Sequence, residues 1–234
     1  MGLVGGSPSR YLELQERKYL TIARKVQIGI LAVLGAFAAL AGQADGKGTR
    51  TLLFFGDSIT AGLGLHDPGR EAYPALIQER ISAARLPWRV INAGLSGETT
   101  AGGLRRVDWV LRAPVDVFVL ALGGNDGLRG IPPAVTEANL DAIIARVCSR
   151  YPAARVVVAG MQMPPNMGPD YTRAYAAVFP AVAGKTGAAL IPFLLEGVGG
   201  RPDLNQADGI HPTAAGHRIV AEDVWRVIEP LLKQ

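Results

Sequence analysis

Cysteine and histidine are scarce in this chain of 234 residues, which has one cysteine and three histidines. A single cysteine excludes an internal disulfide, so the redox compartment has to be inferred from other features. The histidines and the cysteine do not have the spacing of metal ligands, and we predict no metal and no cofactor. Charged residues make up 19% of the chain and apolar residues 49%, which excludes a disordered protein and allows a full hydrophobic core.

The excess of basic residues lies at the amino terminus. Residues 1–44 hold five bases and two acids, which gives them a net charge of +3 out of a total of +4. The rest of the chain is therefore almost neutral, at +1, and lacks the basic excess by which nucleic-acid-binding proteins hold phosphates. We expect no nucleic-acid partner.

The amino-terminal part has the pattern of a targeting segment. Arg24 and Lys25 precede an apolar run, residues 26–42, which ends in small residues. This order is typical of a secretory signal, but the run is also just long enough for an uncleaved anchor, and a buried helix is a third possibility. We therefore predict a signal peptide or membrane anchor in residues 1–45 and a functional domain in residues 46–234. The expected location is periplasmic or secreted, with membrane contact only through the apolar run if it is not cleaved.

Short apolar runs alternate with longer amphipathic segments in the remainder of the chain. This alternation, with strands that are apolar throughout, predicts an α/β protein with a parallel five-stranded sheet covered by helices on both faces. The expected strands are residues 51–55, 89–92, 115–122, 155–159 and 188–192. The expected helices are residues 73–84, 99–111, 134–151, 171–186 and 213–232. The proline-rich residues 163–169 are expected to form a surface loop.

Four polar turns carry the residues that could perform chemistry. Three of them follow predicted strands, and the fourth precedes the last helix. They are Gly56-Asp57-Ser58, Asn92-Ala93-Gly94, Gly123-Gly124-Asn125-Asp126 and Asp208-Gly209-Ile210-His211-Pro212. Because parallel strands end at the same edge of a sheet, where ligands bind in open α/β folds, we expect these turns to converge.

Each turn offers a group with a chemical role. Ser58 is a weak nucleophile until a base takes its proton, and His211 is the base best suited to neutral pH. Asp208 could hold the imidazole tautomer and stabilise the cation. The oxyanion of an acyl-transfer intermediate needs hydrogen-bond donors, and the candidates are the backbone N–H groups of Ser58 and Gly94 and the side-chain amide of Asn125. A glycine at position 94 would let substrate approach the backbone closely.

Each motif also has a simpler explanation when it is taken alone. The serine turn contains common turn residues, Asp208 and His211 could form only a cap and a loop, and the Gly-Gly-Asn-Asp turn would also suit a phosphate. Their joint occurrence, each at the end of its own element, favours catalysis. Structural roles are expected for the remaining polar residues: Asp57 and Asp126 brace their turns, Glu98 lies near a helix amino terminus, His66 is solvated, His217 packs or lies at the surface, and Cys148 is a small buried apolar group.

The four turns resemble the four motif blocks of the SGNH (GDSL-type) hydrolase family, over about residues 51–234. Residues 122–130 and 191–196 are most similar to its bacterial thioesterase I / arylesterase / lysophospholipase group. The resemblance implies a flavodoxin-like three-layer α/β/α fold, the SGNH hydrolase fold. It also implies Ser58 as the nucleophile, His211 as the base, Asp208 as its partner, and an oxyanion hole of Ser58, Gly94 and Asn125.

The function implied by this resemblance is that of a serine hydrolase. It would cleave ester or thioester bonds of small acyl substrates through an acyl-enzyme on Ser58. Two alternatives stay open: an acetyl-ester hydrolase acting on carbohydrate or cell-wall esters, and a non-catalytic ligand-binding module on the same fold. Residues 127–132 match a loop that shapes the acyl pocket in this group, and residues 163–168 depart from its usual Asn-Tyr-Gly sequence, which concerns acyl-chain preference.

Overall fold

The computed structural model describes residues 48–234, so the predicted signal peptide or anchor lies outside the described residues. Residues 49–234 form a compact unit. Within the described part, no helix combines the length and apolarity needed to cross a bilayer.

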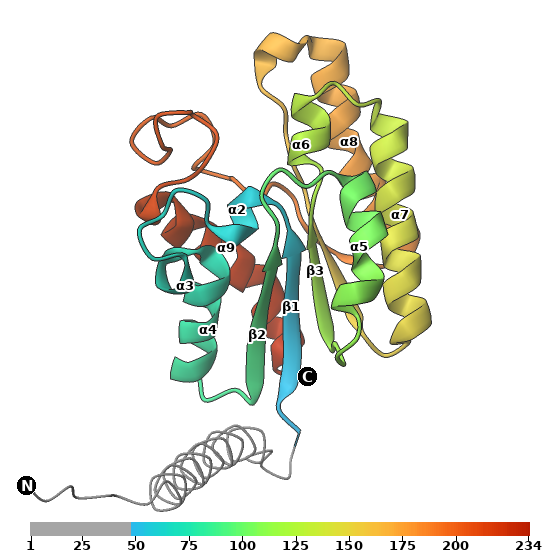
Figure 1. The fold of residues 1–234 in the computed structure, drawn as a ribbon, viewed down its shortest axis with the longest axis vertical. Coiled ribbons are helices and arrows are strands. Elements are labelled where there is room, and N and C mark those ends of the chain that lie inside the picture. Colours follow the sequence, from blue (N-terminus) through green and yellow to red (C-terminus); the bar gives the residue numbers. More distant parts are fainter. Residues whose placement is uncertain (1–47) are drawn as a thin grey trace, which may run out of the picture. The chain divides into compact units, whose positions relative to one another are not determined.

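Five parallel strands form one sheet in the order β2-β1-β3-β4-β5 (Figure 1). This is the strand order of flavodoxin-like folds, so the predicted fold class is confirmed. The five predicted strands are all present, with ends shifted by at most two residues. Their bounds are β1 Arg50–Gly56, β2 Trp88–Gly94, β3 Val117–Ala121, β4 Arg155–Ala159 and β5 Ala189–Ile191.

Helices cover both faces of the sheet and complete the three layers. Helices α4 and α9 pack together on one face, and α5, α7 and α8 pack in series on the other (Figure 1). These are the five predicted helices, with bounds α4 Tyr73–Ala83, α5 Thr100–Val110, α7 Pro133–Arg150, α8 Pro169–Thr186 and α9 Ala214–Leu232. Pro133 occupies the first turn of α7, where its missing N–H costs nothing.

Three short helices were not predicted, and two of them lie at the carboxyl edge of the sheet. They are α2 Ser58–Ala61, α3 Pro68–Glu71 and α6 Gly124–Leu128. Helices of four or five residues show no apolar period in the sequence, which is why they escaped detection. The proline-rich segment is a loop as expected, apart from one 3-10 turn at Pro165–Met167.

The core is centred on β1 and β3, which are covered on both faces. Residues 52–55 and all of β3 are buried. Cys148 is exposed, so the expectation of a buried apolar group was wrong. It follows the buried Val147 by one position on α7, and each helical step turns a side chain by about 100°.

Candidate active site

Ser58 stands where the central strand β1 turns sharply into α2. At Gly56 a side chain is impossible, because a Cβ would lie 2.1 Å from Thr60 Oγ1 and 2.8 Å from the carbonyl oxygen of Ala121. Asp57 caps α2 by accepting the N–H of Ile59 at 3.0 Å, which confirms its predicted bracing role. Ser58 is thus the first residue of α2, where backbone N–H groups have no intrahelical acceptor.

Asp208 and His211 form a compact hydrogen-bonded unit in the loop before α9. One carboxylate oxygen of Asp208 accepts the N–H groups of Ile210 and His211, at 2.9 and 3.0 Å. The other oxygen lies 2.6 Å from His211 Nδ1. These bonds, led by the His211 N–H, lower the pKa of Asp208 to about 2 because they stabilise its charged form.

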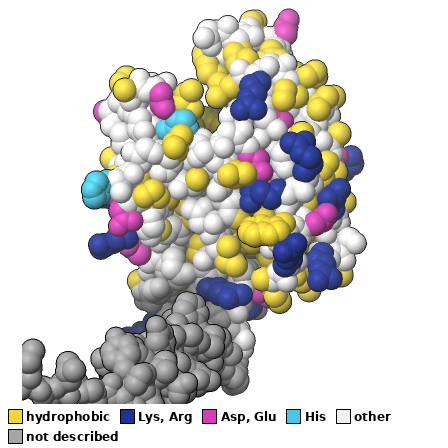
Figure 2. Space-filling model, in the orientation of Figure 1, with side chains coloured by type: hydrophobic (Ala, Val, Ile, Leu, Met, Phe, Trp, Pro, Cys, Tyr) yellow, Lys and Arg dark blue, Asp and Glu magenta, His cyan; other side chains and the backbone are white. Residues whose placement is uncertain are grey.

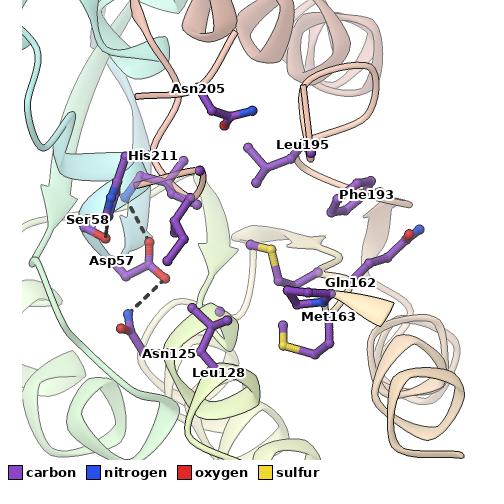
Figure 3. Close-up of a pocket in the computed structure, with 18 of the residues that line it drawn as sticks. Asp57, Ser58, Asn125, Leu128, Gln162, Met163, Phe193, Leu195, Asn205 and His211 are labelled. Atoms are coloured by element: carbon purple, nitrogen blue, oxygen red, sulfur yellow. Dashed lines mark hydrogen bonds between the residues drawn. The ribbon is translucent and has the colours of Figure 1, made fainter. Parts of the chain in front are cut away.

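The two halves of the site meet at the His211 ring. His211 Nε2 lies 2.8 Å from Ser58 Oγ, although the residues are 153 positions apart (Figure 3). Because the Asp208 carboxylate can only accept, it keeps a proton on Nδ1 and leaves Nε2 free to accept from the serine hydroxyl. The arrangement can therefore move the serine proton to His211.

Asn125, on α6, faces the same site. Its side-chain NH₂ group donates to the Glu98 carbonyl oxygen at 3.1 Å and to Asp57 Oδ2 at 3.4 Å (Figure 3). The second bond is long and therefore weak. The two acceptors nevertheless fix the amide with its NH₂ group toward Asp57. Asn125 and Ser58 both line the cavity described below.

Buried contacts behind Asn125 hold α6 in place. Asp126 accepts both the N–H and the hydroxyl of Thr100, at 2.8 and 2.5 Å, so it ties α6 to the first turn of α5 as expected of a bracing residue. Glu98 lies near the amino terminus of α5 as expected, directly before the capping residue Thr99, and it also forms an ion pair with Arg106.

Gly94 lies at the end of β2, in register with Gly56. Its missing side chain makes room for α2, since a Cβ would lie 2.3 Å from the backbone nitrogen of Ala61. We expected a glycine at this position to let substrate approach the backbone, but the structure shows that the glycine is needed for the packing of β2 against α2. Its N–H donates to Asn92 Oδ1 at 3.0 Å, and Gly94 does not line the cavity, so its part in an oxyanion hole stays a prediction.

Two further titratable groups have shifted pKa values. Burial raises the pKa of Asp57 to about 6, although the Ile59 N–H and the nearby His211 favour its ionised form. Burial also lowers the pKa of His217 to about 4. The Nδ1 atom of His217 accepts the N–H of Tyr73 at 3.2 Å, so this histidine packs in the fold as predicted. His66 is exposed, also as predicted.

A cavity of about 610 Å³ opens beside Ser58, Asn125 and His211. Figure 2 shows the molecule hollowed at this edge, with apolar side chains along the hollow. Eight large apolar side chains contribute to the lining: Ile59, Leu63, Leu128, Met161, Met163, Phe193, Leu195 and Ile210. Met163 comes from the proline-rich segment and packs against α6, where a Cβ at Gly127 would lie 2.2 Å from its sulfur. An alkyl chain suits such a lining better than a polar group.

Comparison with known proteins shows the family of the chain. The model of the GDSL-like lipase/acylhydrolase family matches residues 54–219. The chain belongs to this family. It is 45% identical over 184 residues to esterase TesA of Pseudomonas aeruginosa, a match that covers 78% of this chain and 90% of that one. It is 34% identical over 183 residues to thioesterase 1/protease 1/lysophospholipase L1 of Escherichia coli K12, covering 78% and 85%.

Solved structures of esterases have the same fold as this chain. The psychrotrophic esterase EstA from Pseudoalteromonas sp., in a crystal structure inhibited by monoethylphosphonate, is 31% identical with a TM-score of 0.73, covering 79% of this chain and 100% of that one. The predicted family, its fold and the class of GDSL-type ester/thioester hydrolase are confirmed.

Proposed function

We propose that this GDSL-type hydrolase cleaves acyl esters and thioesters through an acyl-enzyme on Ser58. The observation that carries the proposal is the hydrogen-bonded series Asp208–His211–Ser58 at an apolar cavity, with 2.6 Å and 2.8 Å between successive partners. Nucleophile, base and orienting carboxylate are within hydrogen-bond reach of one another, as covalent catalysis by serine requires.

Each group has a distinct role in the proposed reaction. His211 Nε2 takes the hydroxyl proton as Ser58 Oγ attacks the carbonyl carbon, and the Asp208 carboxylate stabilises the resulting imidazolium. The oxyanion accepts hydrogen bonds from the N–H groups of Ser58 and Gly94 and from the Asn125 amide. Asn125 exchanges its long bond to Asp57 for this one, and Gly94 exchanges its bond to Asn92. His211 then gives the proton to the departing alcohol or thiol. A water molecule, activated by the same imidazole, cleaves the acyl-enzyme and releases the acid.

The apolar lining supports acyl chains longer than acetyl. Burying one methylene contributes about 0.8 kcal/mol, which is roughly a fourfold change in kcat/KM. We therefore expect kcat/KM to rise from p-nitrophenyl acetate through butyrate to hexanoate. The names of the relatives, esterase and thioesterase 1/protease 1/lysophospholipase L1, make acyl-CoA and lysophospholipids the next substrates to assay. Highest activity on acetylated polysaccharide would contradict the preference and favour the carbohydrate esterase alternative.

We further propose that the enzyme acts outside the cytoplasm, in the periplasm or secreted. The support is the basic and apolar pattern of residues 1–45, and membrane contact would be confined to that segment. An intact mass spectrum of the mature protein from a fractionated host checks this. Full-length protein in the cytoplasmic fraction would contradict it.

A serine-directed phosphonate tests the nucleophile. We expect one covalent adduct, mapped by mass spectrometry to Ser58, and Ser58→Ala should abolish labelling and lower kcat by about 10⁴–10⁶-fold. The exposed Ser82 on α4 provides a matched control, since Ser82→Ala should leave labelling and turnover unchanged. Persistent turnover in Ser58→Ala would remove Ser58 from its role.

A further inference from the structure

The nucleophile and the base lie on two separate segments that have few polar links. Ser58 belongs to residues 57–65 and His211 to residues 205–213. In the described structure, just two hydrogen bonds join these segments. One is the contact between Ser58 Oγ and His211 Nε2 at 2.8 Å, and the other runs from Gln206 Nε2 to the Leu63 carbonyl oxygen at 2.7 Å. Apart from the reacting pair itself, Gln206 is thus the polar link between them.

Gln206 closes a ring of four hydrogen bonds around the reacting pair. The N–H of Leu63 donates to the Ser58 carbonyl oxygen at 3.0 Å. This bond links Leu63, whose carbonyl oxygen accepts from Gln206, to the nucleophile. The N–H of Gln206 donates to the His211 carbonyl oxygen at 2.8 Å, which ties the glutamine to the base. The side-chain bond from Gln206 to Leu63 and the bond between His211 and Ser58 complete the ring.

Two neighbouring features are shaped around this glutamine. Gly64 has φ +79°, and a Cβ there would lie 2.0 Å from Gln206 Oε1, so the turn after Leu63 leaves the space that Gln206 fills. Gln206 Nε2 also donates to the Pro212 carbonyl oxygen at 3.1 Å, and its own carbonyl accepts the N–H of Gly209 at 2.9 Å. The side chain therefore organises the His211 loop from within and fastens it to the serine segment.

We propose that Gln206 is a positioning residue that holds the His211 loop at hydrogen-bonding distance from Ser58. It does not line the cavity and acts through the carbonyl oxygens of Leu63 and His211. This inference rests on the proposed function, because it takes the contact between Ser58 and His211 to be the catalytic one. A shift of about 1 Å in a reacting group costs up to about 100-fold in rate, so one lost bond in this ring is enough to matter.

The first variant, Gln206→Met, keeps the volume of the side chain and removes the donor. We expect kcat to fall by about 10- to 100-fold with KM little changed, since the acyl cavity is intact. Gln78→Met is the matched control, because Gln78 also links two elements through its side chain, accepting the Val90 N–H at 2.7 Å, but does not line the cavity. This control is expected to melt at a lower temperature with an unchanged kcat.

The second variant, Gln206→Glu, separates positioning from simple stability within one protein. An ionised carboxylate at this site faces the carbonyl oxygens of Leu63 and Pro212 and repels them, whereas the protonated acid can donate to one of them. The ratio of variant kcat to wild-type kcat is therefore expected to rise several-fold as the pH falls from about 7 to about 5. Asp57, Asp208 and His211 are present in both proteins, so any pH dependence that the two proteins share divides out of the ratio.

The outcomes separate the role of Gln206 from the proposed hydrolase function. Wild-type kcat in folded Gln206→Met, or a pH-independent ratio in Gln206→Glu, would overturn the role of Gln206. If Gln206→Met does not fold, the Gln206→Glu ratio alone decides. Should Ser58→Ala remain active, the proposed function falls instead, whatever the glutamine variants do.

Discussion

The serine side of the active site is built by the core, whereas the histidine side is carried by an exposed loop. Residues 52–55 of β1 are at most 1% exposed, and Ser58 at their end is 7% exposed. In the loop, the Asp208 side chain is 44% exposed. The position of the Ser58 hydroxyl therefore depends on global stability, while that of the His211 ring depends on a few local hydrogen bonds. Substitutions in the two regions should consequently change different measured quantities.

Of the three substitutions that test this contrast, Asp208→Asn in the loop is expected to have the largest effect. The amide oxygen can still accept the N–H groups of Ile210 and His211, but the charge that holds the His211 tautomer is lost. We predict that kcat falls by about 10³–10⁴-fold. The free energy of unfolding should change by less than about 1 kcal/mol, since solvent screens this half-exposed carboxylate.

Ester turnover and denaturant unfolding, measured on the same Asp208→Asn preparation, check both parts of this prediction. A kcat within tenfold of wild type would show that the tautomer is held by another group. A large loss of stability would show that the loop is coupled to the core after all.

Asn125→Ala, on the serine side of the site, should have the next largest effect. Losing one oxyanion donor costs about 2.7–4 kcal/mol of barrier, so kcat should fall by about 10²–10³-fold with KM little changed. The Thr100–Asp126 contact holds α6 independently of this side chain. Asn166→Ala, at an exposed position that does not line the cavity, is the matched control. Full turnover in Asn125→Ala would mean that the oxyanion hole is built from other donors.

The smallest effect is expected for stability, from Asp57→Asn. Burial raises the pKa of Asp57 from 3.8 to about 6, so the native state favours the protonated acid and ionisation is destabilising. The loss of folding free energy develops as the pH rises from about 4 to about 6. Above about pH 6 it reaches its full value, on the order of 3 kcal/mol. Asparagine stays neutral and still caps α2.

Urea unfolding at several pH values between about 4 and 8 measures this effect. The stability of Asp57→Asn minus that of wild type should increase with pH over the lower part of this range and then level off. His217, whose pKa is lowered to about 4, destabilises the fold when protonated at acidic pH, but it is present in both proteins and cancels in the difference. A difference that does not vary with pH would show that Asp57 is already protonated or well solvated.

The main strands and helices could be predicted because each extends over enough residues to show a sequence pattern. Buried strands such as β3 are continuous apolar runs, and helices of 11 to 19 residues show their periods and caps. The helices α2 and α6 were missed because four or five residues carry no period. Cys148 was misplaced because one helical step separates a buried from an exposed position.

The reactive groups of the site could be predicted from the sequence, but the residue that holds them in position, Gln206, could not. Ser58, Asn125, Asp208 and His211 stand in recognisable turns. Ser58, Asn125 and His211 line one cavity, and Asp208 is hydrogen-bonded to His211. Nothing in the sequence marks Gln206, because its partner Leu63 is 143 positions away and offers only a carbonyl oxygen. Every residue has such an oxygen, so a side-chain-to-backbone bond leaves no pattern in the sequence.

The parallel sheet, and the groups that can attack, take a proton and hold an oxyanion, could be predicted from the amino-acid sequence, because apolar periodicity and turn residues are local properties. The family followed from the resemblance of the four turns. Only the folded protein shows that the missing side chain of Gly94 makes room for α2, that Asp57 is buried enough to raise its pKa to about 6, and that Gln206 joins the His211 loop to the serine segment. These are consequences of close packing between segments far apart in the chain, and such distances arise only when the chain has folded.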